Sequence, residues 1–505
     1  MRRTAVGGKD IMAKYILVRL LKSIVSLFVV MSIVIIMIFE LIPRNKIFDN
    51  DPSYRKMKGE NKTVYTYQKW DQLGYLDFKR KNEACTVVFG DDEAKVDACG
   101  EKGSDEQKEM IKQMKTDKYE VDHFKNGDPY FVHTYNWIEL LGNYYSTMFF
   151  VDNANKVQDE NNPDMERGYH WEKNPYNGTP ALVCSGCQYK YQLWFNGSFP
   201  FIHTNKFKLN FGLSYPTNQG VPVYQVITDG QGSEAKKDQA FPTGSEQKSA
   251  LIQTTCKYKT KTDKLDQAKF KDNYASCRSS YEDPSMVTTS FVMGIIALII
   301  AYAFGVPAAI DMAQHKGRFR DQLGIAYINI LIAVPSLAFI FFMRSLGSMA
   351  GLPDKFPMLG FKDVRSWIMP TIILAMLNTP SLMMWVRRYM IDQTNEDYVK
   401  FAKAKGLSRT EIFRHHVLRN AIIPIVNSLP SSVILCISGA FITETAFAVP
   451  GMGKMLPDAI SQMNNNMVLC LTFLFTGLAI LAVLVGDILM TVVDPRIQLT
   501  AKGGK

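Results

Sequence analysis

The sequence predicts a polytopic α-helical membrane protein with six transmembrane helices and a large extracytoplasmic α+β insert between the first two. Apolar runs of about 20 residues, the length that crosses a hydrocarbon core of about 30 Å, lie near the N-terminus and in the C-terminal half. Residues 45–283, between them, are polar and charged. The mean hydropathy of −0.07 hides this segregation, and a hydrophobic content of 47% excludes a wholly disordered chain.

Each expected span is bounded by polar, basic or turn-forming residues. The first ends at Pro43 and Arg44, is too long for a signal-peptide core and has no small-residue cleavage site, so we expect an uncleaved anchor. The fifth contains Pro424 and Pro430, which we expect to break its helix and free carbonyls. The predicted spans are residues 17–42, 286–310, 323–346, 367–386, 421–443 and 467–493.

Basic residues in short connections predict the orientation of these spans. They cluster near the N-terminal segment 1–16, after the second span, in the loop 387–420 and in the tail 494–505, whereas the loop 444–466 holds only Lys454. Six spans place all four basic clusters on one side. Both termini are therefore expected in the cytoplasm and residues 43–285 outside the cell. The net charge of +10 is attributed to this orientation rather than to nucleic-acid binding.

The insert is long enough to bury a core of its own. Ser104 and Gln107 form a capping box that predicts a surface helix over 104–118. Alternation over 221–232, broken at Asp229-Gly230, predicts a strand followed by a hairpin turn. The aromatic run 189–203 is expected to be mostly core, with a contact surface for a partner or peptide as the alternative.

Six of the eight cysteines lie in the insert. An even number on the oxidising side of a membrane predicts disulfides, and short loops close most easily, which favours neighbours in the sequence. A zinc site at Cys184 and Cys187 is the alternative, although it lacks a convincing second pair of ligands. The favoured pairs are Cys85–Cys99, Cys184–Cys187 and Cys256–Cys277.

The loop 387–420 carries the most informative local pattern. Asn395 can cap a helix that ends at Gly406, because glycine readily adopts the left-handed conformation found after helix ends. Ser408 and Glu411 form a second capping box. Two helices joined at a glycine corner indicate a rigid bent element that moves with a soluble partner. The alternative is a basic loop that lies on anionic lipid.

The run DYVKFAKAKGLSRTEIFRHHVLRNAIIP resembles the cytoplasmic loop of ABC importer permeases in its peptide-transporter form. Of the family motif Glu-Ala-Ala-x-x-x-Gly, the second Ala and the Gly match Ala402 and Gly406, whereas Lys400 and Phe401 depart from it. ETAFAVPGMGKMLPDAI and GDILMTVVDPRIQLT resemble the family's segment after the fifth span and its C-terminal ending. The similarity covers the six spans in order but not most of 45–283, and it is greatest to first permease subunits of Gram-positive oligopeptide importers.

This resemblance implies a type I ABC importer permease: a subunit that forms half of an oligopeptide pathway in the plasma membrane of a Gram-positive bacterium. The implied partners are a second homologous permease, two cytoplasmic ABC ATPases and an extracellular lipid-anchored peptide-binding protein. ATP and Mg are expected on the ATPases, because this chain has no G-x-x-x-x-G-K-[ST] sequence. We expect no metal, cofactor or enzymatic activity in this chain. The implied ATPase-coupling residues are Ala402, Gly406, Leu407, Ser408, Arg409 and Glu411.

A peptide path needs room and polar groups that contact the peptide backbone. Helix–helix hydrogen bonding explains small polar residues in spans equally well. A receptor that senses an extracellular ligand without transport is the alternative function; an enzyme or a secondary transporter finds no support, since no catalytic constellation or inverted repeat is evident. The insert is expected to shape the docking site of the binding protein or to wall the peptide entry. The candidate path residues are Asn378, Ser381, Asn427, Ser431, Ser432 and Glu444.

Overall fold

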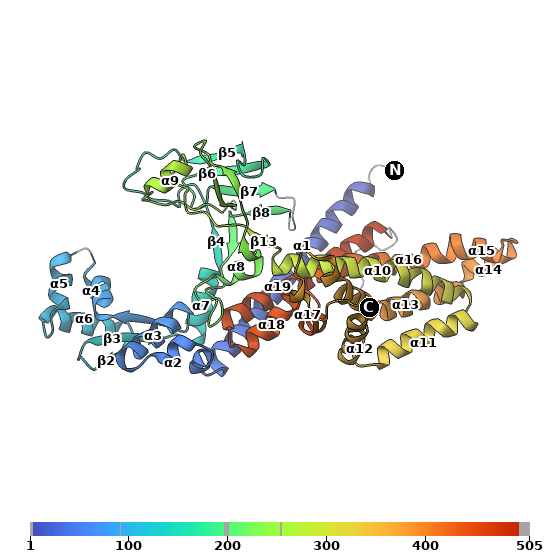
Figure 1. The fold of residues 1–505 in the computed structure, drawn as a ribbon, viewed down its shortest axis with the longest axis horizontal. Helices are drawn as coiled ribbons and strands as arrows, with labels where there is room; N and C mark the ends of the chain where they lie inside the picture. The colour runs from blue at the N-terminus through green and yellow to red at the C-terminus, as the bar shows by residue number, and fades with distance from the viewer. Residues whose placement is uncertain (1–3, 91, 196–200, 253–254, 494–505) are drawn as a thin grey trace.

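The structure is a computed structural model that describes residues 4–90, 92–195, 201–252 and 255–493. Within this part of the chain, five helices are long and apolar enough to span a bilayer, and one bent pair can make a sixth. Figure 1 shows these helices gathered together, with the insert projecting from one end of the group and α14 and α15 at the other. They are α1 (Thr4–Ile36), α10 (Met286–Gln314), α11 (Phe319–Ala333), α12 (Ser336–Met349), α13 (Val364–Thr394), α16 (Leu418–Leu435) and α19 (Asn465–Val493).

The third predicted span, 323–346, is not one straight helix. α11 and α12 are bent by 106° at a short break. Pro335 lies at this break and precedes α12, and proline both removes a backbone donor and disfavours helical conformation in the residue before it. α12 is then held near the insert-side end of the spans, where the Arg344 guanidinium donates to the Ala446 carbonyl at 2.8 Å.

The fifth predicted span, 421–443, is broken at a different place from the one expected. Pro424 and Pro430 both lie inside the continuous helix α16. The break follows at Gly439, whose φ of +76° lies in the left-handed region that favours glycine. A 3₁₀ turn (Cys436–Ser438) precedes this glycine, and α17 (Phe441–Phe447) follows it. The prediction that the prolines break this span is therefore wrong.

The first lobe of the insert packs helices on both sides of a small antiparallel sheet with the order β1-β3-β2. Phe131 on β3 is fully buried with the Cys85–Cys99 disulfide, whereas Phe78 on β1 packs with the aromatic side chains of α3. The expected helix at 104–118 is confirmed as α6, whose first turn is capped by Ser104. The elements are η2 (Arg44–Phe48), α2 (Pro52–Lys56), α3 (Gly59–Gln72), β1 (Leu76–Arg80), α4 (Lys81–Phe89), α5 (Glu93–Gly100), α6 (Asp105–Thr116), β2 (Glu120–His123), β3 (Pro129–Thr134) and α7 (Trp137–Met148).

The second lobe is built on a four-stranded antiparallel sheet with the order β5-β6-β7-β8. Tyr191 and Trp194 of the aromatic run are buried in its core, whereas Phe195 and Phe201 are exposed; residues 196–200 lie outside the described residues. The elements are β4 (Phe149–Val151), β5 (Gly168–Lys173), β6 (Pro180–Ser185), β7 (Tyr191–Phe195), β8 (Ile202–Thr204), β9 (Phe207–Leu209), α8 (Val223–Thr228), β10 (Gln231–Glu234), β11 (Lys236–Ala240), β12 (Glu246–Ala250), α9 (Lys264–Lys269) and β13 (Tyr281–Asp283).

The predicted strand and hairpin over 221–232 are wrong. Residues 223–228 form the helix α8, in which Val223 and Ile227 are buried four residues apart, the spacing of one helix face. Asp229-Gly230 then leads into β10, which pairs with the distant strand β13. Burial against other elements therefore overrides the local strand propensity of this valine-rich and isoleucine-rich segment.

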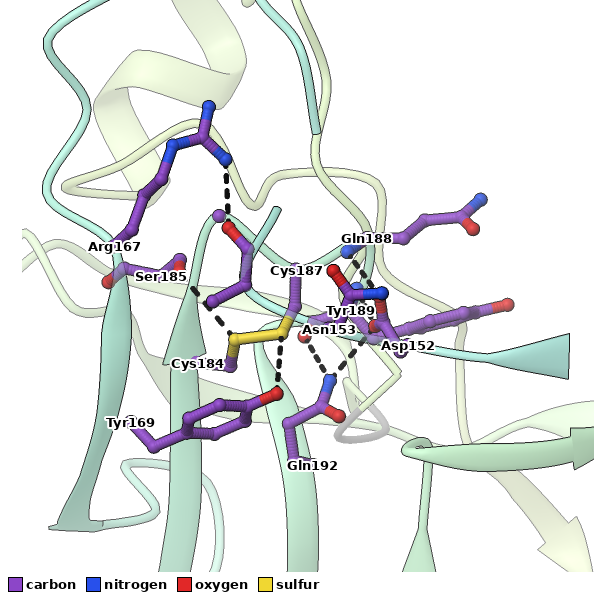
Figure 2. Close-up of a disulfide and its surroundings, with 12 residues drawn as sticks. Asp152, Asn153, Arg167, Tyr169, Cys184, Ser185, Cys187, Gln188, Tyr189 and Gln192 are labelled. Carbon is purple, nitrogen blue, oxygen red and sulfur yellow. Dashed lines mark hydrogen bonds between the residues drawn. A yellow bond between two sulfur atoms is a disulfide. The ribbon is translucent and has the colours of Figure 1, made fainter. Parts of the chain in front are cut away.

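Three disulfides join the six cysteines of the insert in the pairs that sequence proximity favours: Cys85–Cys99, Cys184–Cys187 and Cys256–Cys277. Figure 2 shows the second of them, at the end of β6. Gly186 lies between its cysteines with a φ of +85°, and a side chain there would meet the Ala154 carbonyl at 2.1 Å. Nearby, the buried Asp152 carboxylate accepts hydrogen bonds from the Gln188 and Tyr189 backbone amides at 2.8 and 2.9 Å, which hold the connection between β6 and β7 against the residue that follows β4.

Three consecutive asparagines attach the insert to the start of the last span. Asn464 donates to the Ser214 hydroxyl at 2.8 Å, Asn465 to the Tyr75 hydroxyl at 2.5 Å, and Asn466 to the Leu213 carbonyl at 3.0 Å. All three asparagines are buried. Because Tyr75 belongs to the first lobe and Leu213 and Ser214 to the second, both lobes are hydrogen-bonded to the beginning of α19.

Candidate functional site: a cavity between spans and a two-helix loop

A cavity of about 670 Å³ lies between α10, α13 and α16. Small residues of α10, among them Gly294 and Ala301, leave room on one side, and Pro424 contributes from α16. The polar members of its lining are Ser290, Tyr302, Asn378, Ser381, Tyr389, Ser428 and Ser432. The walls thus combine hydroxyl and amide groups with apolar surface, a composition suited to a flexible polar ligand.

Three of the six predicted path residues line this cavity: Asn378, Ser381 and Ser432. Asn427 and Ser431 do not, because that face of α16 packs against α19. The Ser431 hydroxyl donates to the Ala482 carbonyl at 2.9 Å, and a Cβ at Gly486 would lie 3.4 Å from the Asn427 carbonyl oxygen. The geometry therefore favours a role in helix–helix packing for Asn427 and Ser431.

Sequence reasoning missed the aromatic part of the lining. Trp385 and Tyr389 of α13 line the cavity, and their rings stack with centroids 5.8 Å apart. The positions 378, 381, 385 and 389 follow the three-and-four spacing of one helix face. The same spacing links Pro424, Ser428 and Ser432 on α16. This periodicity could have separated Ser432 from Ser431.

Glu444 lies behind the wall of the cavity rather than in it. Its side chain is fully buried, and its Oε1 accepts the Ser290 hydroxyl at 2.7 Å and the Ala440 amide at 3.0 Å. Oε2 accepts the Lys454 amide at 3.0 Å. Side chains at the neighbouring glycines would collide with this carboxylate, since a Cβ would lie 2.4 Å from its oxygen at Gly439 and 2.6 Å at Gly451. Glu444 therefore joins α10, α17 and α18 (Met452–Ser461) at the end of the cavity nearer the insert.

A bidentate ion pair lies nearer the end of the spans that is opposite the insert. The Arg387 guanidinium of α13 donates to both carboxylate oxygens of Asp321 on α11, at 2.6 and 2.8 Å. Asp321 also accepts the Gly317 amide at 2.8 Å and is only 1% exposed. The planar fork of arginine matches a carboxylate in this geometry, so the pair fixes α11 against α13. A second ion pair, between Arg19 and Asp487, joins α1 to α19.

The two-helix loop, residues 395–417, has the helix, glycine and capping box that its sequence predicts. α14 (Asp397–Ala404) ends before Gly406, whose φ is +79°. The Glu411 carboxylate accepts the Ser408 amide at 2.8 Å, and the Ser408 hydroxyl accepts the Glu411 amide at 3.3 Å. The residue that precedes α14 is Glu396, without a side-chain cap, so the expected cap at Asn395 is wrong.

The second helix of this loop runs directly into the fifth span. α15 (Arg409–Ile412) continues through a π-helical turn (Phe413–Val417) into α16, which lines the cavity. The inner face of the loop is anchored, because Ala402, Ile412 and Phe413 are buried in a cluster with α10 and α13. Movement of this loop therefore has a continuous helical connection to the cavity wall.

The outer face of the two-helix loop is exposed. Phe401 is 70% exposed and Leu407 is 38% exposed, and Gly406, Ser408 and Glu411 are exposed beside them. The side chain of Arg409 lies outside the described residues. Among the six predicted coupling residues, Ala402 belongs to the anchored face, whereas Gly406, Leu407, Ser408 and Glu411 belong to the exposed face.

No group of three or more His, Cys, Asp or Glu side chains in the described part of the chain is placed to hold a metal ion. Cys184 and Cys187, the alternative zinc ligands, are joined to each other as a disulfide.

Comparisons with known proteins match both the spans and the insert. Residues 301–499 match the family model described as "Binding-protein-dependent transport system inner membrane component". The "Oligopeptide transport system permease protein AmiC" of Streptococcus pneumoniae serotype 4 is 39% identical over 499 residues, which cover 98% of this chain and 100% of that protein. Two Bacillus subtilis (strain 168) proteins match more narrowly. The "Oligopeptide transport system permease protein AppB" is 30% identical over 43% of this chain and 69% of its own length. The "Dipeptide transport system permease protein DppB" is 29% identical over 42% and 69%.

Proposed function

From the premise that this chain belongs to the family of oligopeptide transport system permeases, we propose that its cavity is one half of an oligopeptide path and that its two-helix loop couples this path to ATPases. The chain is a transmembrane permease subunit of a peptide importer and not an enzyme. It is a multi-pass membrane protein with about five to six apolar helices, which functions with another permease, ATPase subunits and a substrate-binding protein.

The observation that carries this proposal is the continuity of one helix. α16 contributes Pro424, Ser428 and Ser432 to the cavity and continues without interruption into the second helix of the loop. A soluble ATPase that binds the exposed Phe401 and Leu407 would move α16 directly, since the buried cluster below them transmits displacement. The proposed partners of this exposed face are two cytoplasmic ABC ATPases, which bind ATP and Mg themselves.

The size and lining of the cavity support a peptide as substrate. A cavity of about 670 Å³ falls within the range of small-molecule pockets, about 300–1,000 Å³, and a second homologous permease would complete its open side. Asn378, Ser381 and Ser432 offer donors and acceptors without a fixed charge, which accommodates peptides of many sequences.

The orientation and compartment follow from the same proposal. With the two-helix loop in the cytoplasm, both termini are cytoplasmic and the insert lies outside the plasma membrane of a Gram-positive bacterium. An extracellular lipid-anchored binding protein would then dock on the insert. Trp171 on β5, 59% exposed, and Leu182 and Leu193 beside it in register give one face of the four-stranded sheet an apolar surface for such contact.

Reconstitution tests the proposal. The chain is purified with a second permease and two ATPases, placed in proteoliposomes with the binding protein outside, and supplied with ATP inside and a labelled oligopeptide outside. We expect ATP-dependent accumulation of the peptide. ATP hydrolysis without accumulation would contradict the transport role. Accumulation that is unchanged on deletion of the insert would contradict the proposed docking role of the insert alone.

A further inference from the structure

A second cavity, of about 420 Å³, lies in the first lobe of the insert. One wall is a face of the three-stranded sheet, and the other is formed by α3 and the η2 turn that follows the first span. No residue that lines the cavity between the spans contributes to it. It is therefore a separate cavity with its own chemistry.

The sheet wall carries two carboxylates. Glu120 and Asp122 lie on β2, opposite Val132 and Tyr130 of β3, and alternation along a strand directs residues two apart to the same face. All four of these residues line the cavity. Phe131, between Tyr130 and Val132, points to the other face and is buried with the helices of the lobe.

The opposite wall carries a cation on an aromatic surface. The Arg44 guanidinium lies 5.6 Å from the centroid of the Trp70 ring, and the Trp70 indole donates to the Arg44 carbonyl at 3.4 Å. The Tyr67 ring packs edge-on against Trp70, with centroids 5.3 Å apart, and lies 5.4 Å from the Tyr130 ring. Aromatic rings thus form the floor of the cavity between the Arg44 guanidinium and the two carboxylates of β2.

Among the described residues, none of these three charged groups has an ion-pair partner. Neither Arg44 nor Glu120 forms an ion pair with any other described residue. Asp122 accepts only neutral donors: the Tyr130 hydroxyl at 2.6 Å and the His123 amide at 2.7 Å. The Tyr130 hydrogen bond lowers the pKa of Asp122, so this carboxylate stays ionised at neutral pH. An unpaired guanidinium and two carboxylates therefore face one cavity.

We propose that this cavity binds a zwitterion, a free amino acid or a very short peptide, with its ammonium group at Glu120 and Asp122 and its carboxylate at Arg44. Charge-assisted hydrogen bonds are the strong polar contacts of binding sites, and an aromatic floor binds apolar side chains and attracts cations. A ligand with only a negative charge would meet the repulsion of two carboxylates. A ligand with only a positive charge would leave Arg44 unpaired.

Binding at this site would also affect the first span. Arg44 begins a turn that is separated from the last turn of that span, Met37–Leu41, by only Ile42 and Pro43. A ligand that bridges Arg44 and the sheet would hold the outer end of this span against the first lobe. The inference stands apart from the transport proposal, because its test measures binding by this chain without ATPases or transport.

The test uses the full chain in lipid nanodiscs and isothermal titration calorimetry. The probes are L-phenylalanine, the dipeptide glycyl-phenylalanine, N-acetyl-phenylalanine, which lacks the ammonium group, and phenylalanine amide, which lacks the carboxylate. We expect at least one of the two zwitterions to bind, and whichever binds more tightly identifies the ligand. We expect acetylation and amidation each to weaken binding by about tenfold or more, as the loss of one charged hydrogen-bond partner predicts.

Variants then assign the contacts. We expect Arg44→Gln to weaken zwitterion binding by about tenfold and to remove the discrimination against phenylalanine amide. Glu120→Gln with Asp122→Asn should instead remove the discrimination against N-acetyl-phenylalanine. Glu109→Gln and Lys112→Gln, on the exposed surface of α6, are charge-matched controls that should leave affinity unchanged, and thermal unfolding confirms that each variant is folded.

Three results would overturn the proposal. The first is no binding of either zwitterion. The second is binding that the Arg44 and Glu120/Asp122 variants leave unchanged, which would place the ligand in the cavity between the spans. The third is phenylalanine amide that binds as tightly as phenylalanine, which would make this a simple cation site.

Discussion

The Ser290 hydroxyl donates a hydrogen bond of 2.7 Å to the Glu444 carboxylate, and the same hydroxyl oxygen accepts the Met452 amide at 2.7 Å. This contact joins the beginning of α10, which lines the cavity, to the segment that follows the fifth span. The carboxylate occupies the space that side chains at Gly439 and Gly451 would need. Glu444 is therefore a fixed structural centre at one end of the cavity.

Replacing Glu444 tests this role. Glu444→Gln presents an amide NH₂ to a backbone N–H donor on one of its two sides, which leaves that donor unsatisfied. We expect a loss of about 1–3 kcal/mol of stability, as for other buried unsatisfied groups, and a lower midpoint in a thermal unfolding assay of the detergent-purified chain. Glu93→Gln, at an exposed position of α5, is the matched control. An unchanged midpoint for Glu444→Gln would contradict the structural role.

Lys208 on β9 gives the insert a pH dependence. Burial, together with the nearby charges of Arg278 and Lys257, lowers the pKa of Lys208 to about 7. The unfolded chain, with an ordinary lysine pKa, binds more protons between that value and about 10.4. The stability contribution of this group therefore rises with pH across this window and is lost as pH falls through about 7.

The variant Lys208→Met isolates this contribution. We expect it to be more stable than wild type at pH 6 to 7 and to show a smaller increase in stability towards pH 10. Urea unfolding at several pH values, followed by fluorescence of the insert, measures the difference. Lys173→Met, at the exposed end of β5, serves as the control. Parallel pH profiles for wild type and Lys208→Met would show that Lys208 keeps an ordinary pKa.

The contact between Asn465 and Tyr75 attaches the first lobe to the last span. Tyr75→Phe removes the acceptor of a buried amide and should cost about 1–3 kcal/mol. We expect faster cleavage by limited proteolysis at the junction of insert and spans, since the lobe loses one of its attachments. Tyr224→Phe, a tyrosine of α8 with no hydrogen-bond partner for its hydroxyl among the described residues, is the control. Equal cleavage rates for the two variants would contradict the attachment.

The cavity between the spans should tolerate no large side chain. Ser432→Phe places a ring in the cavity, whereas Leu429→Phe enlarges a 41% exposed residue on another face of the same helix. We expect Ser432→Phe to reduce peptide uptake by about tenfold or more, an effect of about 1.4 kcal/mol or more on the limiting step, while Leu429→Phe keeps uptake near wild type. Both complexes should retain ATPase subunits. Equal uptake would mean that the peptide does not pass this cavity.

Local signals predicted the apolar helices and the Gly406 and Ser408–Glu411 features of the two-helix loop, whereas non-local contacts account for the errors in the third and fifth spans. Apolar length identifies a span whatever it packs against, and the Ser408–Glu411 capping box lies within four residues. Proline is less decisive: Pro307 and Pro370 lie inside intact helices, whereas Pro335 marks a bend of 106°. Whether a proline bends a helix depends on how neighbouring helices pack against it. The sequence near the proline does not reveal this packing.

The difference between local signals and non-local contacts also explains which site residues the sequence placed correctly. Whether Ser431 or Ser432 faces the cavity depends on which side of α16 packs against α19, where the contact of Ser431 lies 51 residues away in the chain. The position of Glu444 depends on Ser290, 154 residues earlier. Helical spacing groups Ser432 with Pro424 and Ser428, but no local signal shows which face of α16 lines the cavity or where Glu444 lies. By contrast, the exposed face of the two-helix loop follows from its own capping residues and glycine.

The most direct test of the account is co-purification of ATPases through the two-helix loop. The wild-type chain is co-expressed with a second permease and candidate ATPases, and compared with a variant that carries Gly406→Pro and Glu411→Arg. Arg318→Glu, an exposed charge in the connection after α10, is the control. We predict that ATPases with a Walker sequence co-purify with wild type and with the control but not with the folded loop variant. ATPases that remain bound to the loop variant, or that bind none of the three forms, would contradict the coupling role.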